Sequence, residues 1–175
     1  MTTQVRRTRT YIAFDGDTDL MSYRTIQGWS ADRDTPFSLN DAHELNYARD
    51  DSLPESIIVQ LRARLDASRH LLLIIGSATN TNRKGILQYE LNYALRNKLP
   101  IFLTYKGYDD VVTKCNDRLW TQSLEPHIPA AVRNAAKADK YGLVMPFTKP
   151  RVITAIVGWS NVVLPAAGYT WHWAA

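Results

Sequence analysis

Cysteine is almost absent from this 175-residue chain, in which Cys115 is the single example. One cysteine excludes an internal disulfide and any metal centre built from several thiolates, so we expect the reducing cytoplasm as the compartment. The longest unbroken apolar run, LLLII at 71–75, is far too short to cross a membrane as a helix. The chain also opens without the charged-then-apolar leader of a secreted protein.

The chain also has no large excess of one charge, because 21 Lys and Arg residues nearly balance 17 Asp and Glu residues and leave a net charge of +4. No basic stripe interleaved with aromatic residues accompanies this balance, so we expect no nucleic-acid partner. The hydrophobic share of 45% is that of a globular protein. The length suits one domain with a full core, and we expect residues 1–175 to form it.

Strand-like and helix-like segments alternate along the chain. Helices are predicted after the capping box of Ser52 and Glu55 and in four further segments, at 18–33 (in part), 84–97, 129–138 and 149–159. The alternation predicts a three-layer, flavodoxin-like α/β domain with a mostly parallel five-stranded sheet. Its strands are expected at 10–14, 36–39, 70–75, 99–105 and 141–147.

Two strands have features that place them in the sheet. Segment 70–75 contains the continuous apolar run LLLII, the pattern of a strand that is buried on both faces of a parallel sheet. Pro146 has no N–H to donate, so the fifth strand should lie at an edge or end there.

Polar loops follow the first three strands: DGDTD at 15–19, NDAHELN at 40–46 and GSATN at 76–80. Ligands of such sheets bind outside the carboxyl ends of the strands, so these loops mark the expected site.

Glu90 is an acid within the apolar-periodic helix at 84–97. At 100° per residue it lies about 80° from the centre of the stripe of Leu87, Leu91, Ala94 and Leu95. We therefore expect it at the shoulder of the buried face, where a partly shielded carboxylate exerts a stronger field on a ligand. The alternative is a solvated glutamate that pairs with a base such as Arg83.

Several motifs occur together in a specific order. They are Phe14-Asp15-x-Asp17, DAHELNYARDDS at 41–52, Arg64-Leu65-x-x-Ser68 before LLLIIGSAT, and Tyr89-Glu90-Leu91-x-x-Ala94-Leu95 before LPIF. In this order the motifs resemble the TIR-like domain of the bacterial group that includes the Thoeris anti-phage component. The resemblance is best over residues 10–105.

This resemblance implies a flavodoxin-like TIR fold, in which Glu90 matches the helix glutamate that TIR enzymes use to cleave NAD. NAD would be a substrate, with no permanently bound cofactor and no metal. The products in this group are often cyclic or otherwise modified ADP-ribose signals that activate a partner effector. Self-association of the domain is left open.

The other expected ligand contacts lie in the three polar loops. Phe14 would stack on a ring of NAD or end a core strand, and Asp15 and Asp17 would bond ribose hydroxyls or shape a turn. Ser77 and Thr79 would contact phosphate or cap a turn. The second loop contributes Asp41, His43 and Asn46. One position departs from the family pattern, because Ile86 stands where the family often has an aromatic residue.

Two rival interpretations remain. A Mg²⁺-dependent phosphotransferase of the haloacid-dehalogenase kind would use Asp15 as nucleophile and Asp17 as acid and base, but Asp19 stands where that family has Thr or Val. A non-catalytic TIR-type adaptor would act by self-association. A calcium loop is rejected because Leu20 replaces its glycine. The WHW segment at 171–173 is expected to pack on the body or form a subunit contact.

Overall fold

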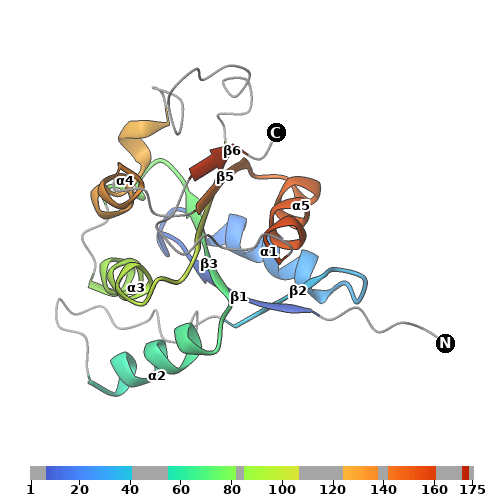
Figure 1. Ribbon diagram of the computed structural model, residues 1–175, viewed down its shortest axis with the longest axis horizontal. Helices are drawn as coiled ribbons and strands as arrows, with labels where there is room; N and C mark the ends of the chain where they lie inside the picture. Colours follow the sequence, from blue (N-terminus) through green and yellow to red (C-terminus); the bar gives the residue numbers. More distant parts are fainter. Residues whose placement is uncertain are drawn as a thin grey trace.

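The described strands form one sheet between two layers of helices (Figure 1). The computed structural model describes residues 7–40, 55–81, 85–106, 124–137, 142–160 and 171–173. Every described strand pair is parallel, in the order β2-β1-β3-β4-β5-β6. The strands are β1 (Thr8–Ala13), β2 (Phe37–Leu39), β3 (His70–Ile75), β4 (Ile101–Tyr105), β5 (Gly142–Pro146) and β6 (Trp171–Trp173).

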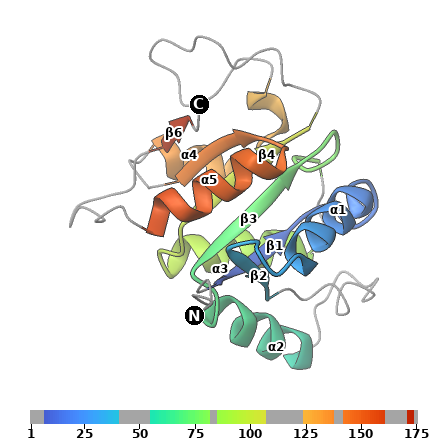
Figure 2. The ribbon, with the colours of Figure 1, turned by 90° about the vertical axis from the view of Figure 1, so that its right-hand side faces the viewer.

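Five α-helices of the described residues divide between the two faces of the sheet (Figures 1 and 2). One face is covered by α1 (Leu20–Ala31) and α5 (Lys149–Ser160). The other is covered by α2 (Glu55–Asp66), α3 (Gly85–Arg96) and α4 (Ala130–Lys137), with the 3-10 helix η3 (Glu125–His127) before α4. This is the three-layer, flavodoxin-like arrangement predicted from the strand–helix alternation.

The central strand β3 separates two hydrophobic cores. All six of its residues are buried, as the continuous apolar run predicts. Leu71, Leu73 and Ile75 pack in the core beneath α2, α3 and α4. Leu72 and Ile74 pack in the core beneath α1 and α5. Because the side chains alternate, a residue's position along a strand decides which core it enters.

The five predicted strands and the predicted helices are all present in the structure. The capping box of α2 cannot be checked because Ser52 lies outside the described residues. The predicted sheet was one strand short, since the WHW segment forms β6 and pairs with β5. Three residues carry too little periodicity to be recognised as a strand. Pro146 is the last residue of β5, so this strand ends at the proline without lying at the edge.

None of the described helices combines the length and apolar character needed to cross a membrane.

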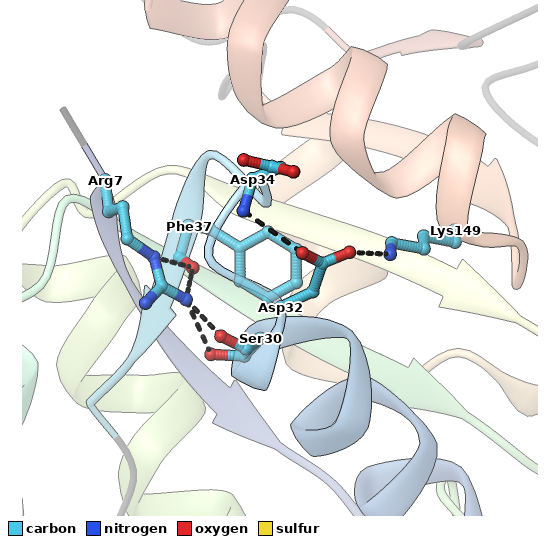
Figure 3. A network of polar contacts seen from close by, with 6 residues as sticks. All are labelled: Arg7, Ser30, Asp32, Asp34, Phe37 and Lys149. Carbon is cyan, nitrogen blue, oxygen red and sulfur yellow. Dashed lines mark hydrogen bonds and ion pairs between the residues drawn. The ribbon is translucent and has the colours of Figure 1, made fainter. Parts of the chain in front are cut away.

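A polar network ties the start of β1 to α1, β2 and α5 (Figure 3). Arg7 donates from Nε to the Phe37 carbonyl oxygen at 3.0 Å and from Nη2 to the Ser30 carbonyl oxygen. Lys149, at the start of α5, pairs with Asp32 just after α1 at 3.0 Å. The bond from Lys149 is the main reason why the pKa of Asp32 lies below its usual range. These contacts are at the amino ends of β1 and β2, and the carboxyl ends lie at the opposite edge of the sheet.

Candidate functional site

Glu90 occupies a core position on α3. The helix buries Leu87, Glu90, Leu91 and Ala94, which follow the i, i+3, i+4, i+7 spacing of one helix face. Only 4% of Glu90 is exposed, whereas Leu95 is only partly buried. The predicted shoulder position was therefore wrong, because the stripe is rotated toward Glu90 and away from Leu95.

At this core position Glu90 meets a hydroxyl group from the sheet beneath the helix. Tyr11 belongs to β1, is fully buried and packs in the core beneath α2, α3 and α4. Its hydroxyl donates a hydrogen bond to Glu90 Oε1 at 2.6 Å. The two residues are 79 positions apart in the chain. The tertiary fold therefore supplies a polar partner for a glutamate that occupies a core position.

Burial and the hydrogen bond from Tyr11 together shelter the Glu90 carboxyl group from water. Acidic side chains are almost never fully buried unless they are paired, because an ion loses its hydration. A hydrogen bond to a charged group recovers about 1.5–3 kcal/mol of that loss. A negative charge held in such a position acts on a nearby cation more strongly than one in water.

A second polar group lies at the carboxyl ends of β1 and β3. These strands are neighbours in the sheet, while the chain passes through the edge strand β2 between them. The helices after β1 and β3 lie on opposite faces, so this is the topological switch point at which flavodoxin-like folds bind ligands. The loops DGDTD and GSATN both leave the sheet here, as predicted.

Asp15 shapes the first of these loops. The residue is 4% exposed, and its Oδ1 accepts the backbone N–H of Asp17 at 2.9 Å and that of Thr18 at 3.3 Å. An aspartate that binds the backbone two residues ahead forms an Asx turn. The carboxylate thus fixes the path of the chain from β1 to the start of α1.

Asp19 and Gly76 pack tightly against each other across the switch point. Asp19 is 8% exposed, and a Cβ added to Gly76 would lie 2.6 Å from Asp19 Cγ. Only a glycine lets the end of β3 approach the carboxyl group this closely. Thr79 is fully buried, accepts the Gly76 N–H at 2.8 Å and places its hydroxyl 3.5 Å from Asp19 Oδ2.

Burial and charge both act on the Asp19 carboxyl group. Burial, and then the negative charge of Asp15, raise the pKa of Asp19 above its ordinary value of 3.8. Hydrogen bonds from Thr18 and Thr79 and the charge of Lys106 act in the opposite direction. The switch point therefore holds two acids whose mutual repulsion a proton or a positive charge would relieve.

Phe14 and Glu90 lie on opposite faces of the sheet. Phe14 is buried beneath α1 and α5, with its ring stacked on Tyr23 at a centroid distance of 4.7 Å. Glu90 bonds Tyr11, whose side chain enters the core on the other face. Tyr11 and Asp15 are four positions apart in the chain, which is about 13 Å of extended backbone. The expected site is thus divided between the sheltered carboxylate and the switch point.

The family model of the Thoeris protein ThsB, TIR-like domain, matches residues 11–110, which is more than half of the chain. The chain belongs to this family. A comparison with curated proteins finds no significant match. Membership confirms the resemblance drawn from the motifs and gives the protein a TIR-type role in anti-phage defence.

The remaining predicted contacts of this TIR-like domain fall into two groups. Asp17 and Ser77 are exposed in the loops at the switch point. Asp41, His43 and Asn46 lie outside the described residues. Ile86, at the position where the family often has an aromatic residue, packs against the core beneath α2, α3 and α4.

Sequence reasoning did not include Tyr11 or Asp19 among the site residues. Tyr11 has the one polar atom in the apolar segment YIAF, and a buried tyrosine hydroxyl usually has a partner. That signal was available, although it does not name Glu90 as the partner. Asp19 belongs to the DGDTD loop, but its contact with Gly76 crosses from one loop to another.

Proposed function

We propose that this TIR-like domain cleaves the nicotinamide–ribose bond of NAD, with Glu90 as the catalytic carboxylate. The observation that carries the proposal is the buried Glu90 of α3, which matches the family's helix glutamate in the motif Tyr89-Glu90-Leu91. Membership of the ThsB TIR-like family supports the same assignment.

The chemistry of the bond suits a single carboxylate. As the bond to nicotinamide breaks, positive charge develops on the ribose, as it does in glycoside cleavage. A sheltered carboxylate close to C1′ stabilises that charge, and the same oxygens can accept hydrogen bonds from the ribose hydroxyls. Nicotinamide leaves as a neutral molecule from a cationic ring, so the reaction requires no general acid to protonate it.

We propose that the rest of NAD binds at the switch point, beside the loops that follow β1 and β3. Loop residues such as Asp17 and Ser77 are exposed there, and the buried Asp15 holds the backbone of the first loop in place. Because Glu90 is only 4% exposed, the ribose must displace neighbouring groups in order to reach it. This requirement gives a physical reason to expect a resting protein whose activity awaits a trigger.

The product would serve as a signal. We propose that the ADP-ribose fragment is released in a cyclic or otherwise modified form and activates a separate effector protein. The acceptor of the fragment is then a hydroxyl or ring nitrogen held against C1′, or water in the case of simple hydrolysis. Self-association of the domain is compatible with this scheme.

The test follows nicotinamide release and the ADP-ribose products by mass spectrometry. Purified protein is incubated with NAD, alone and with extract from phage-infected bacteria to supply a trigger. We expect Glu90→Gln and Glu90→Ala to abolish release. Glu55→Gln, at the exposed start of α2, serves as the matched control and should leave release unchanged.

Two results would oppose the proposal. Turnover that survives both Glu90 substitutions would refute the assignment of this carboxylate. A wild-type protein that releases no nicotinamide under either condition would instead favour the TIR-type adaptor, in which Glu90 and Tyr11 form a purely structural polar pair.

A further inference from the structure

The hydrogen bond between Tyr11 and Glu90 joins strand β1 to α3, the helix that carries the proposed catalytic group. The Tyr11 hydroxyl lies 2.6 Å from Glu90 Oε1, and both side chains are buried. We infer that Tyr11 is the positioning residue of the Glu90 carboxylate, an inference that rests on the proposed function. It would hold the carboxylate in one orientation and keep it ionised.

Tyr11 is a rigid anchor because of its place in the sheet. β1 is hydrogen-bonded to β2 on one side and to β3 on the other, with Tyr11 in register with Leu71. The tyrosine ring has two side-chain torsions, and its burial in the core restricts both. A glutamate has three torsions, so a fixed partner is needed to hold its carboxylate within the narrow range that catalysis requires.

The same bond affects the charge of Glu90. A phenol hydroxyl donates a stronger hydrogen bond to an ionised carboxylate than to a neutral carboxylic acid, so the bond favours the ionised form. Burial acts against ionisation, so without the hydroxyl the carboxylate would take up a proton at higher pH. Tyr11 thus supports both properties that the proposed chemistry requires, which are a fixed position and a negative charge.

A second tyrosine on α3 provides a matched control. Tyr93 donates to Asp66 Oδ1 of α2 at 2.9 Å, which is also a phenol-to-carboxylate bond. This bond links two helices at the surface and does not involve the sheet. Tyr93→Phe therefore also removes a phenol hydroxyl that is bonded to a carboxylate, but at a bond in which Glu90 takes no part.

The first experiment measures nicotinamide release between pH 4 and 8 for the wild type, Tyr11→Phe and Tyr93→Phe, with folding checked by circular dichroism. Loss of a bond to a charged group should lower kcat/KM by about 10-fold to 100-fold in Tyr11→Phe. The acid limb of its profile should move up by about one to two pH units, since a proton competes better for Glu90. Tyr93→Phe should match the wild type in both respects.

The second experiment needs no activity. The side-chain carboxyl carbon of Glu90 is labelled with ¹³C and titrated by NMR, and its signal is identified by its absence from Glu90→Gln. A midpoint that moves to higher pH in Tyr11→Phe and stays in place in Tyr93→Phe supports the inference even if the protein does not turn over NAD. An unchanged midpoint in Tyr11→Phe overturns it.

The kinetic outcomes are equally decisive. A Tyr11→Phe variant that matches or exceeds the wild type in kcat/KM, with an unmoved acid limb, overturns the positioning role. If Tyr11→Phe does not fold, Glu90→Asp replaces it, because its shorter side chain keeps the charge and withdraws the carboxylate from Tyr11. The aspartate carboxyl carbon is then titrated by NMR, and a midpoint above the ordinary aspartate value of about 3.9 is expected, whereas a midpoint at or below that value would contradict the inference.

Discussion

The close approach of Gly76 to Asp19 gives a quantitative prediction for Gly76→Ala. A Cβ at this position would lie 2.6 Å from Asp19 Cγ, where carbon atoms normally approach to about 3.5–4.0 Å. Asp19 is 8% exposed and lies between Asp15 and Thr79, so it cannot swing into water without giving up its packing. The alanine must therefore push the loop and the start of α1 apart.

The expected cost follows from two opposing effects. Overpacking a buried position costs about 1–3 kcal/mol. Alanine restricts the unfolded chain more than glycine does, which raises the free energy of unfolding by about 0.4–1 kcal/mol. The midpoints of these ranges give a net loss of about 1.3 kcal/mol, which should lower the melting temperature by about 3–5 °C in a domain of this length.

Thermal unfolding followed by circular dichroism measures this difference. Gly28→Ala is the matched control, because Gly28 is inside α1 and a Cβ added there meets nothing within 4 Å. Alanine forms helix better than glycine by about 0.8–1 kcal/mol, so this variant should melt higher than the wild type.

A double mutant tests the cause. When Asp19→Ala removes the carboxyl group, the added cost of Gly76→Ala should fall below 0.5 kcal/mol, about the error of additivity. The close approach is not what requires glycine if Gly76→Ala melts at the same temperature as the wild type. The same conclusion holds if Gly76→Ala loses as much stability in the Asp19→Ala background as in the wild type.

Two further predictions concern pH. Burial lowers the pKa of His70 to about 3, so the folded imidazole stays neutral while the unfolded one gains a proton below its usual 6.5. Its contribution to stability is complete above pH 6.5 and falls by about 1.4 kcal/mol per pH unit below that value. Denaturant unfolding from pH 7 to 4.5 should show a shallower loss in His70→Gln than in the wild type, and equal slopes would contradict the assignment. The raised pKa of Asp19 makes stability depend on pH in the opposite direction. The stabilisation that comes from Asp19 is complete below pH 3.8 and is lost as the pH rises through the pKa of Asp19 in the folded state. Asp19→Asn should therefore be more stable than the wild type at pH 7, with the advantage shrinking toward pH 4. Asp17→Asn, in the exposed part of the loop, is the control, and an advantage of Asp19→Asn that does not change with pH would refute the explanation.

Much of the architecture could be predicted because it depends on local patterns. The strand predicted at 70–75 from its apolar run has the same ends as β3 in the structure. The periodicity of α3 and α5 predicts their bounds to within a residue. These signals are strong because burial on one or both faces imposes a period on the residues themselves.

The candidate site was only partly predictable. The loops after β1 and β3 were expected to meet, and they do, because parallel strands end at the same edge of the sheet. Glu90 was singled out by its place in an apolar helix and by its match to the TIR glutamate. Its burial was not anticipated, since a helix pattern gives the angle of a side chain but not the atom that it meets.

The amino-acid order alone determined the layers, most of the sheet, the family motifs and the choice of Glu90, because each of these follows from neighbours within a few turns of chain. Only the tertiary structure decided that Tyr11 donates to Glu90 across 79 residues, that Asp19 packs against Gly76, and that Phe14 lies on the other face of the sheet from Glu90. The physical reason is that a hydrogen bond or a steric contact depends on distances of a few tenths of an ångström between atoms that only the completed fold brings together.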